Sequence, residues 1–137
     1  MATLLDTNVL IDIAVRDPRW LKWSRAKVED ARRRGSVVIN PIIYAEFSMR
    51  YEAIDAVEAA LPSDAFRREA LPFDAAFAAA RAFALYRLRG GKRDKVLPDF
   101  LIGAHAAVRG YPILTRDPTG YRAYFPGVEL ITPETHP

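Results

Sequence analysis

The chain has 137 residues, of which half are hydrophobic and 27% are charged, so it suits one folded domain rather than a disordered segment. The lack of cysteine and the presence of only two histidines exclude disulfides, thiolate metal sites and histidine-rich metal sites. The net charge is +3, and arginine supplies 16 of the 20 basic residues. Because the arginine fork matches phosphate geometry, this surplus favours a polyanionic partner.

Most of the basic residues fall in two segments, residues 16–34 and residues 87–95. The first segment ends in three consecutive arginines, Arg32, Arg33 and Arg34. We expect these segments to hold a nucleic-acid backbone, and the alternative is a solvated surface of mixed charge.

Predicted strands are short apolar segments, and predicted helices are marked by caps and by apolar residues at helical spacing. The first half reads, in chain order, strand 3–5, helix 8–15, helix 18–34, strand 37–39, helix 41–51 and helix 54–61. The second half reads short strand 70–73, helix 74–89, helix 98–109, strand 113–115, a turn or short helix at 121–125 and strand 128–131. Asp6 or Thr7 caps the first helix, Asp17 the second and Asp74 the helix 74–89.

The helix 74–89 carries a regular apolar stripe. The residues that recur at helical spacing are Phe77, Ala80, Ala84 and Leu88. We expect the face that they form to be buried in the core.

Alternating strands and helices predict an α/β fold, with a parallel sheet covered by helices on both faces. No repeat or linker divides the chain, so residues 1–137 are expected to form one domain. No basic segment precedes an apolar one at the start, and the longest uncharged apolar run, residues 100–108, is shorter than a membrane span. We therefore expect a cytoplasmic protein without membrane association.

Four acidic residues stand at positions that the predicted fold can bring together. Asp6 and Asp117 each follow a predicted strand, where sites form in open parallel sheets. Glu46 shares an otherwise apolar helix face, and Asp99 lies in the first turn of the helix 98–109. Four carboxylates that converge repel one another and call for a hard cation, of which Mg²⁺ or Mn²⁺ suits oxygen ligands best. Such an ion promotes phosphodiester hydrolysis without a histidine or serine nucleophile.

Each acid also has a structural explanation. Asp6 can serve as a helix cap, and Asp99 can complement a helix dipole. Asp117 precedes a proline, as in a type I turn, and Glu46 can pair with an arginine or point to solvent. Taken singly these explanations are the commoner ones, but all four acids can meet at one end of one sheet.

The chain resembles the PIN-domain family, especially VapC-like toxin ribonucleases of toxin–antitoxin pairs. The matching stretches are Leu4–Asp12, Ala45–Phe47, Leu97–Ala106, Leu114–Asp117 and Tyr124–Gly127. The resemblance implies a three-layer α/β/α sandwich with a central parallel sheet of about five strands. It also implies RNA cleavage with Mg²⁺ or Mn²⁺, a homodimer and a small VapB-like antitoxin as partner.

Residue by residue, the resemblance places the catalytic and metal-binding positions at the four acids. Thr7 and Thr115 match hydroxyl positions that orient a carboxylate or a water molecule. Arg116, beside Asp117, is a possible RNA contact, although a surface role at the strand end is the commoner one.

Other functions remain as alternatives. A catalytically spent module that binds nucleic acid or a partner could share the fold, but four intact acids argue against it. A phosphatase with an aspartyl nucleophile at Asp6 would need a second acid at position 8, which is Asn8. DNA flap nucleases use similar carboxylates in much longer chains.

Overall fold

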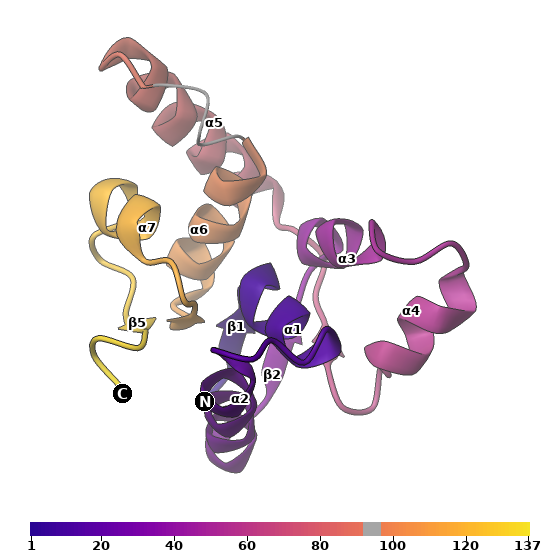
Figure 1. The fold of residues 1–137 in the computed structure, drawn as a ribbon. Coiled ribbons are helices and arrows are strands. Elements are labelled where there is room, and N and C mark those ends of the chain that lie inside the picture. Colours follow the sequence, from indigo (N-terminus) through magenta and orange to yellow (C-terminus); the bar gives the residue numbers. More distant parts are fainter. Residues whose placement is uncertain (92–96) are drawn as a thin grey trace.

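A computed structural model of the chain describes residues 1–91 and 97–137. At its centre lies a parallel sheet of five strands in the order β3-β2-β1-β4-β5 (Figure 1). The strands are β1 (Thr3–Leu5), β2 (Val37–Ile39), β3 (Arg67–Arg68), β4 (Ile113–Leu114) and β5 (Leu130–Ile131). The predicted basic loop at residues 92–95 lies outside the described residues.

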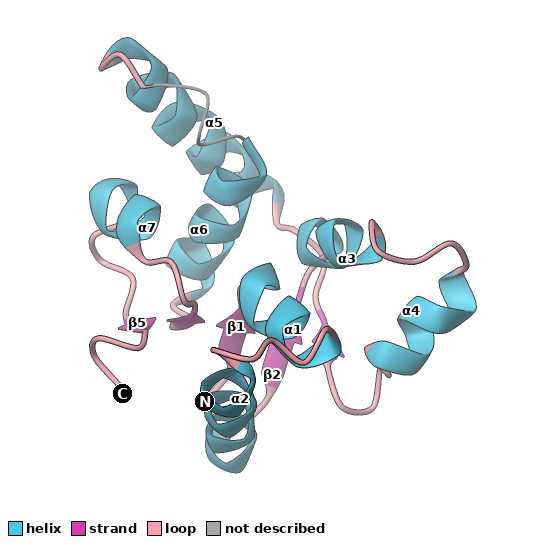
Figure 2. Cartoon of the chain, viewed as in Figure 1, coloured by secondary structure: helices cyan, strands magenta, loops and turns pink. Residues whose placement is uncertain are grey.

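Helices surround this sheet (Figure 2). They are α1 (Thr7–Ala14), α2 (Leu21–Arg34), α3 (Pro41–Ser48), α4 (Ile54–Ala60), α5 (Phe73–Leu88), α6 (Leu97–Arg109) and α7 (Thr119–Tyr124). The prediction of a three-layer α/β/α sandwich with a parallel five-stranded sheet is confirmed. No described helix is long and apolar enough to cross a membrane.

The central strands form because they are apolar on both sides. Every residue of β1, β2 and β4 is buried, as expected for parallel strands with a helix layer on each face. Side-chain caps then start the helices that follow two of these strands. The Asp6 carboxylate accepts a hydrogen bond from the Thr7 amide at α1, and the Asn40 side chain accepts one from the Ile43 amide at α3.

The strand order places a functional edge next to β1. The chain adds β2 and β3 on one side of β1 and later adds β4 and β5 on the other side. The carboxyl ends of β1 and β4 therefore flank the point where the direction of the crossovers reverses. Ligands bind at this point in open parallel sheets.

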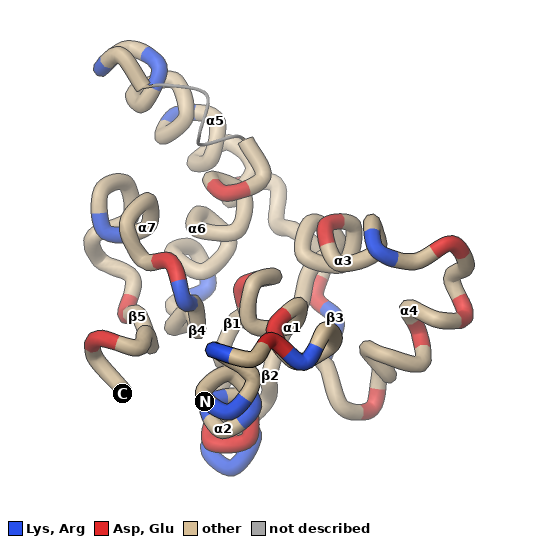
Figure 3. The backbone as a smooth tube through the Cα atoms, viewed as in Figure 1, with Lys and Arg blue, Asp and Glu red and all other residues tan. Residues whose placement is uncertain are grey.

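The basic residues at the end of α2 lie at the opposite edge. α2 ends at Arg34, and the chain enters the amino end of β2 three residues later, where the Thr3 amide donates to the Ser36 carbonyl. Figure 3 shows the basic positions of α2 well away from α3 and α6. Arg32, Arg33 and Arg34 are thus remote from the carboxyl edge, which disfavours the expectation that they hold a substrate there.

The prediction of a strand at residues 70–73 is wrong. The strand that forms in this part of the chain is β3, and its Arg67 and Arg68 pair with Val38 and Ile39 of β2. Both arginine side chains are exposed, so this strand carries no apolar signal in the sequence. The apolar residues at 71–73 instead lead into α5, which begins after Pro72 rather than at a cap on Asp74.

The prediction that the apolar stripe of α5 is buried in the core is wrong. The stripe of Phe77, Ala80, Ala84 and Leu88 is exposed, with Phe77 at 69% and Leu88 at 83%. The opposite face, with Ala75, Ala79 and Tyr86, packs on Phe100 of α6 and its neighbours. Because α5 is apolar nearly all round, the spacing of its residues did not indicate which face would be covered.

His105 has a packing role on α6. Its ring is fully buried, with Nδ1 2.9 Å from the Asn40 amide nitrogen and Nε2 3.2 Å from a Glu69 oxygen. Burial raises the pKa of Glu69, but hydrogen bonds from Tyr111, His105 and Arg67 outweigh it and lower that pKa to about 2. This network ties α6 to the region of β3, away from the acidic residues.

Candidate active site

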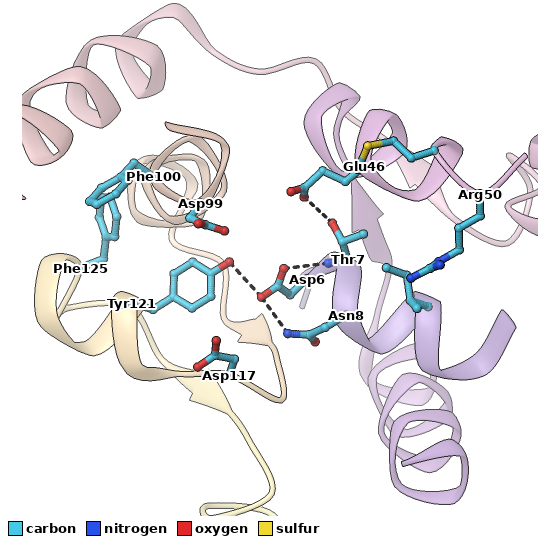
Figure 4. A pocket seen from close by; sticks show the side chains of 13 residues that line it. Asp6, Thr7, Asn8, Glu46, Arg50, Asp99, Phe100, Asp117, Tyr121 and Phe125 are labelled. Carbon is cyan, nitrogen blue, oxygen red and sulfur yellow. Dashed lines mark hydrogen bonds between the residues drawn. The ribbon is translucent and has the colours of Figure 1, made fainter. Parts of the chain in front are cut away.

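The four predicted acids line one pocket of about 560 Å³ (Figure 4). Asp6 follows β1, Glu46 comes from α3, Asp99 from the first turn of α6, and Asp117 from the loop after β4. Four elements that are distant in sequence thus bring carboxylates to the carboxyl edge of the sheet. The pocket lies at the point of crossover reversal, where the strand order places a ligand.

Asp6 is the most buried of these acids, with 9% of its surface exposed. One oxygen accepts from the Thr7 amide at 2.8 Å. The other accepts from the hydroxyls of Thr115 at 2.8 Å and Tyr121 at 3.0 Å. Burial, with a smaller contribution from the charge of Glu46, raises the pKa of Asp6 to about 6, although these hydrogen bonds favour the ionised form.

Glu46 is electrostatically coupled to its neighbours. Burial and the charge of Asp99 raise the pKa of Glu46, while a 2.7 Å hydrogen bond from the Thr7 hydroxyl lowers it. No arginine pairs with Glu46 within the described part of the chain, so the core ion pair considered for it is absent there. The hydrogen-bond donors around Asp6 and Glu46 are neutral, and a cation would therefore compensate charge that no described side chain compensates.

Thr115 joins two of the acids. Its hydroxyl donates to Asp6 and accepts from the backbone amide of Asp117 at 3.0 Å. The Asn8 amide group donates to Thr115 at 3.2 Å and lies 3.4 Å from Asp6. Thr7 and Thr115, the two threonines predicted from the sequence, thus both contact carboxylates. Asn8 connects the start of α1 to the segment that follows β4.

Tyr121 is a pocket residue that sequence reasoning missed. It belongs to α7, is 5% exposed and donates to Asp6, and Figure 4 shows its ring between Asp99 and Asp117. Burial and the charge of Asp6 raise its pKa well above the ordinary value, so it stays a donor. The sequence around Tyr121 has no signal for this contact, which forms because α7 returns to the carboxyl edge of the sheet.

The four acids surround the pocket without closing on one point. Among residues 1–91 and 97–137, no three carboxylate, histidine or cysteine side chains lie close enough to share one ion in this geometry. Neutral donors hold Asp6 and Glu46, and the phenol of Tyr121 lies among the acids. The donor set itself fits a hard divalent cation, because carboxylate oxygens are its preferred ligands.

Arg116 pairs with Asp12 of α1 and does not line the pocket. Its guanidinium donates to both oxygens of Asp12, at 2.7 and 2.8 Å, and lies 5.6 Å from the ring of Trp20. The expected RNA contact by Arg116 stays a prediction, and this ion pair already uses two of its nitrogens. The basic side chain that lines the acidic pocket within the described residues is Arg50, next to Met49.

The fold and the pocket together define an α/β protein with a carboxylate-lined site at the switch point of a parallel sheet. A family model for the PIN domain matches residues 3–126, and the chain therefore belongs to the PIN-domain family. The resemblance seen in the sequence motifs is confirmed. A comparison with curated proteins gave no match.

Solved structures share this fold. A chain in the crystal structure of VapBC2 from Rickettsia felis bound to a promoter DNA fragment superposes with a TM-score of 0.76 at 15% identity, over 96% of this chain and 98% of that one. A chain of VapBC-1 from Haemophilus influenzae gives a TM-score of 0.71 at 16% identity, over the same shares. A chain in a toxin–antitoxin complex from Klebsiella pneumoniae gives 0.64 at 26% identity, over 96% and 97%.

Proposed function

We propose that this chain is a Mg²⁺- or Mn²⁺-dependent endoribonuclease and the toxin of a toxin–antitoxin pair. The observation that carries the proposal is the convergence of Asp6, Glu46, Asp99 and Asp117 on one pocket in a PIN-family fold. Similarity in fold to chains of VapBC complexes supports the assignment to a toxin. We further propose that residues 1–137 act as one domain in the cytoplasm.

In this proposal the four acids hold the divalent ion. When bound, such an ion polarises a phosphate oxygen and makes a water molecule more acidic. Thr115 and Tyr121 donate to Asp6 and keep one of its oxygens oriented, and Thr7 does the same for Glu46. These hydrogen bonds therefore hold the carboxylates of Asp6 and Glu46 in place before substrate binds, and such preorganisation is the protein's main contribution to this kind of catalysis.

The direct test is cleavage of total RNA by the purified chain. We expect cleavage in Mn²⁺ or Mg²⁺, none in excess EDTA, and recovery when the ion is restored, because oxygen ligands act here only through a hard cation. An Asp99→Asn variant prepared in the same way should be inactive and controls for contaminating nuclease. Equal cleavage by this variant, or full activity in EDTA, would refute the four-carboxylate mechanism.

The proposal includes two protein partners. The outward stripe of α5, with Phe73 at 95% and Phe77 at 69% exposure, offers apolar surface of the kind that a second copy covers in a homodimer. A VapB-like antitoxin is the other proposed partner, by analogy with the VapBC complexes of the same fold.

The RNA backbone is expected to contact Arg50. This exposed arginine lines the acidic pocket, whereas Arg33 pairs with Asp30 at the far edge of the sheet. Replacing Arg50 with alanine should weaken RNA binding similarly for all sequences and reduce the slope of log affinity against log salt by about 0.7. Filter binding of single-stranded RNA in Ca²⁺ between 50 and 200 mM salt measures both quantities.

Arg33→Ala is the matched control, because it removes the same charge far from the pocket. We expect it to leave the salt slope unchanged. Equal losses in the two variants would mean that binding follows net charge alone, and an unchanged Arg50→Ala variant would place the RNA elsewhere.

A further inference from the structure

An ion pair between a buried carboxylate and a partly exposed arginine connects α1 to the segment that carries Asp117. Asp12, on α1, is 1% exposed, and its two oxygens accept hydrogen bonds from Nε and Nη2 of Arg116. The Ser24 hydroxyl donates a third bond to Asp12 at 2.8 Å. Burying a charged carboxylate costs solvation free energy. A bidentate hydrogen-bonded ion pair with a third donor offsets that cost.

The pair is attached to the pocket through the backbone. Arg116 lies between Thr115 and Asp117, and its own amide donates to the Asn8 side chain at 3.2 Å. Asn8 and Asp12 are four residues apart and therefore share one face of α1. This face of α1 binds Arg116 at two places: Asn8 accepts a hydrogen bond from its backbone amide, and Asp12 pairs with its guanidinium.

The same helix starts at Asp6, which caps it. One rigid element therefore carries the first acid and also anchors the segment that carries the fourth. This anchor adds a second connection between Asp6 and Asp117, beside the one through the Thr115 hydroxyl, and it acts on a loop in which Asp117 is exposed.

We infer that Asp12 and Arg116 are positioning residues, which fix Asp117 relative to Asp6 and so set the affinity of the pocket for a divalent ion. Neither side chain needs to touch RNA for this role. The part of the inference that concerns catalysis rests on the proposed function, whereas the part that concerns ion affinity is testable without it.

Arg116→Lys is the most informative variant. It keeps the charge but removes the fork that holds both oxygens of Asp12. We expect Mn²⁺ affinity, measured by calorimetric titration, to fall by roughly 10- to 100-fold, as when other residues that orient metal ligands are changed. The kcat for RNA cleavage should fall with it, while KM and the salt dependence of RNA binding stay near the wild-type values.

Two results would overturn the inference. A raised KM and a smaller salt slope with unchanged Mn²⁺ affinity would make Arg116 an RNA contact. A lower melting temperature with unchanged Mn²⁺ affinity and kcat, measured well below melting, would make the pair purely structural. Arg122→Lys is the matched control, because the Arg122–Glu134 pair is exposed and lies outside the pocket, and it should leave every readout unchanged.

A second variant guards against loss of folding. Asp12→Asn alone leaves a guanidinium without its charge partner, so we pair Asp12→Leu with Arg116→Met, which replaces the ion pair by apolar side chains of similar branching and length. This double variant should fold and still bind Mn²⁺ more weakly than the wild type. Wild-type affinity in the folded double variant contradicts the inference. Wild-type protein that binds Mn²⁺ but cleaves no RNA contradicts only the proposed function.

Discussion

Replacing Glu46 with glutamine is expected to lower RNA cleavage by about 100-fold or more while leaving the fold intact. The glutamine side-chain oxygen can still accept a hydrogen bond from the Thr7 hydroxyl. The change also removes a negative charge that Asp99 repels. In EDTA the variant should therefore be as stable as the wild type, to within about 1 kcal/mol. Added Mn²⁺ should raise the melting temperature of the wild type more, since an ion bound to the native state stabilises it by mass action.

Glu58→Gln provides the matched comparison. Glu58 is a carboxylate outside the pocket, paired with Arg68 and hydrogen-bonded to Tyr44. Its replacement should lower the melting temperature in EDTA and preserve both the response to Mn²⁺ and the cleavage rate. If instead Glu46→Gln melts lower in EDTA and Mn²⁺ shifts all three proteins equally, Glu46 has a structural role only.

A fall in pH from 7 to 5 is expected to stabilise the protein in EDTA and to weaken its binding of Mn²⁺. The folded-state pKa of Asp6 is about 6, above the value of 3.8 for an exposed aspartate. A raised pKa means that the folded state binds the proton more tightly. Stability from this group is therefore fully present below pH 3.8 and is lost as the pH rises through 6.

The expected gain at pH 5 is about 1 kcal/mol, or about 3 °C in melting temperature. Because the ion needs ionised Asp6, the proton competes with it, and apparent Mn²⁺ affinity should fall roughly tenfold over the same interval. Melting curves in EDTA and calorimetric titrations with Mn²⁺ measure the two effects. Asp6→Asn should abolish the pH-dependent gain in EDTA, and a variant that retains the full gain would assign it to other groups.

The positions of the acids were accessible from sequence because each has a local signal. Asp6 directly follows the buried strand β1, and Asp117 lies in the loop after β4. Asp99 lies in the first turn of a helix, and Glu46 interrupts an apolar helix face. The parallel sheet was equally accessible, since its central strands are apolar throughout. These features depend on neighbours in the chain, which a sequence displays directly.

The rest of the site depends on contacts between distant segments. Asp12 and Arg116 are 104 residues apart, and nothing near either one indicates the other, although a lone acid in the apolar run Val9–Ala14 was an available hint. Tyr121 reaches Asp6 across a separation of 115 residues. The outward face of α5 was missed for a different reason, because a helix that is apolar nearly all round has no periodic signal for its buried side.

The two edge strands of the sheet determine whether another chain can add a strand to it. Its edge strands, β3 and β5, are each two residues long, and β3 presents the side chains of Arg67 and Arg68. A further strand that added at β3 or β5 would meet only a few unpaired backbone groups and, at β3, two arginine side chains that already form ion pairs. Association through strand addition is therefore disfavoured at both edge strands, which favours association through side chains on the helices.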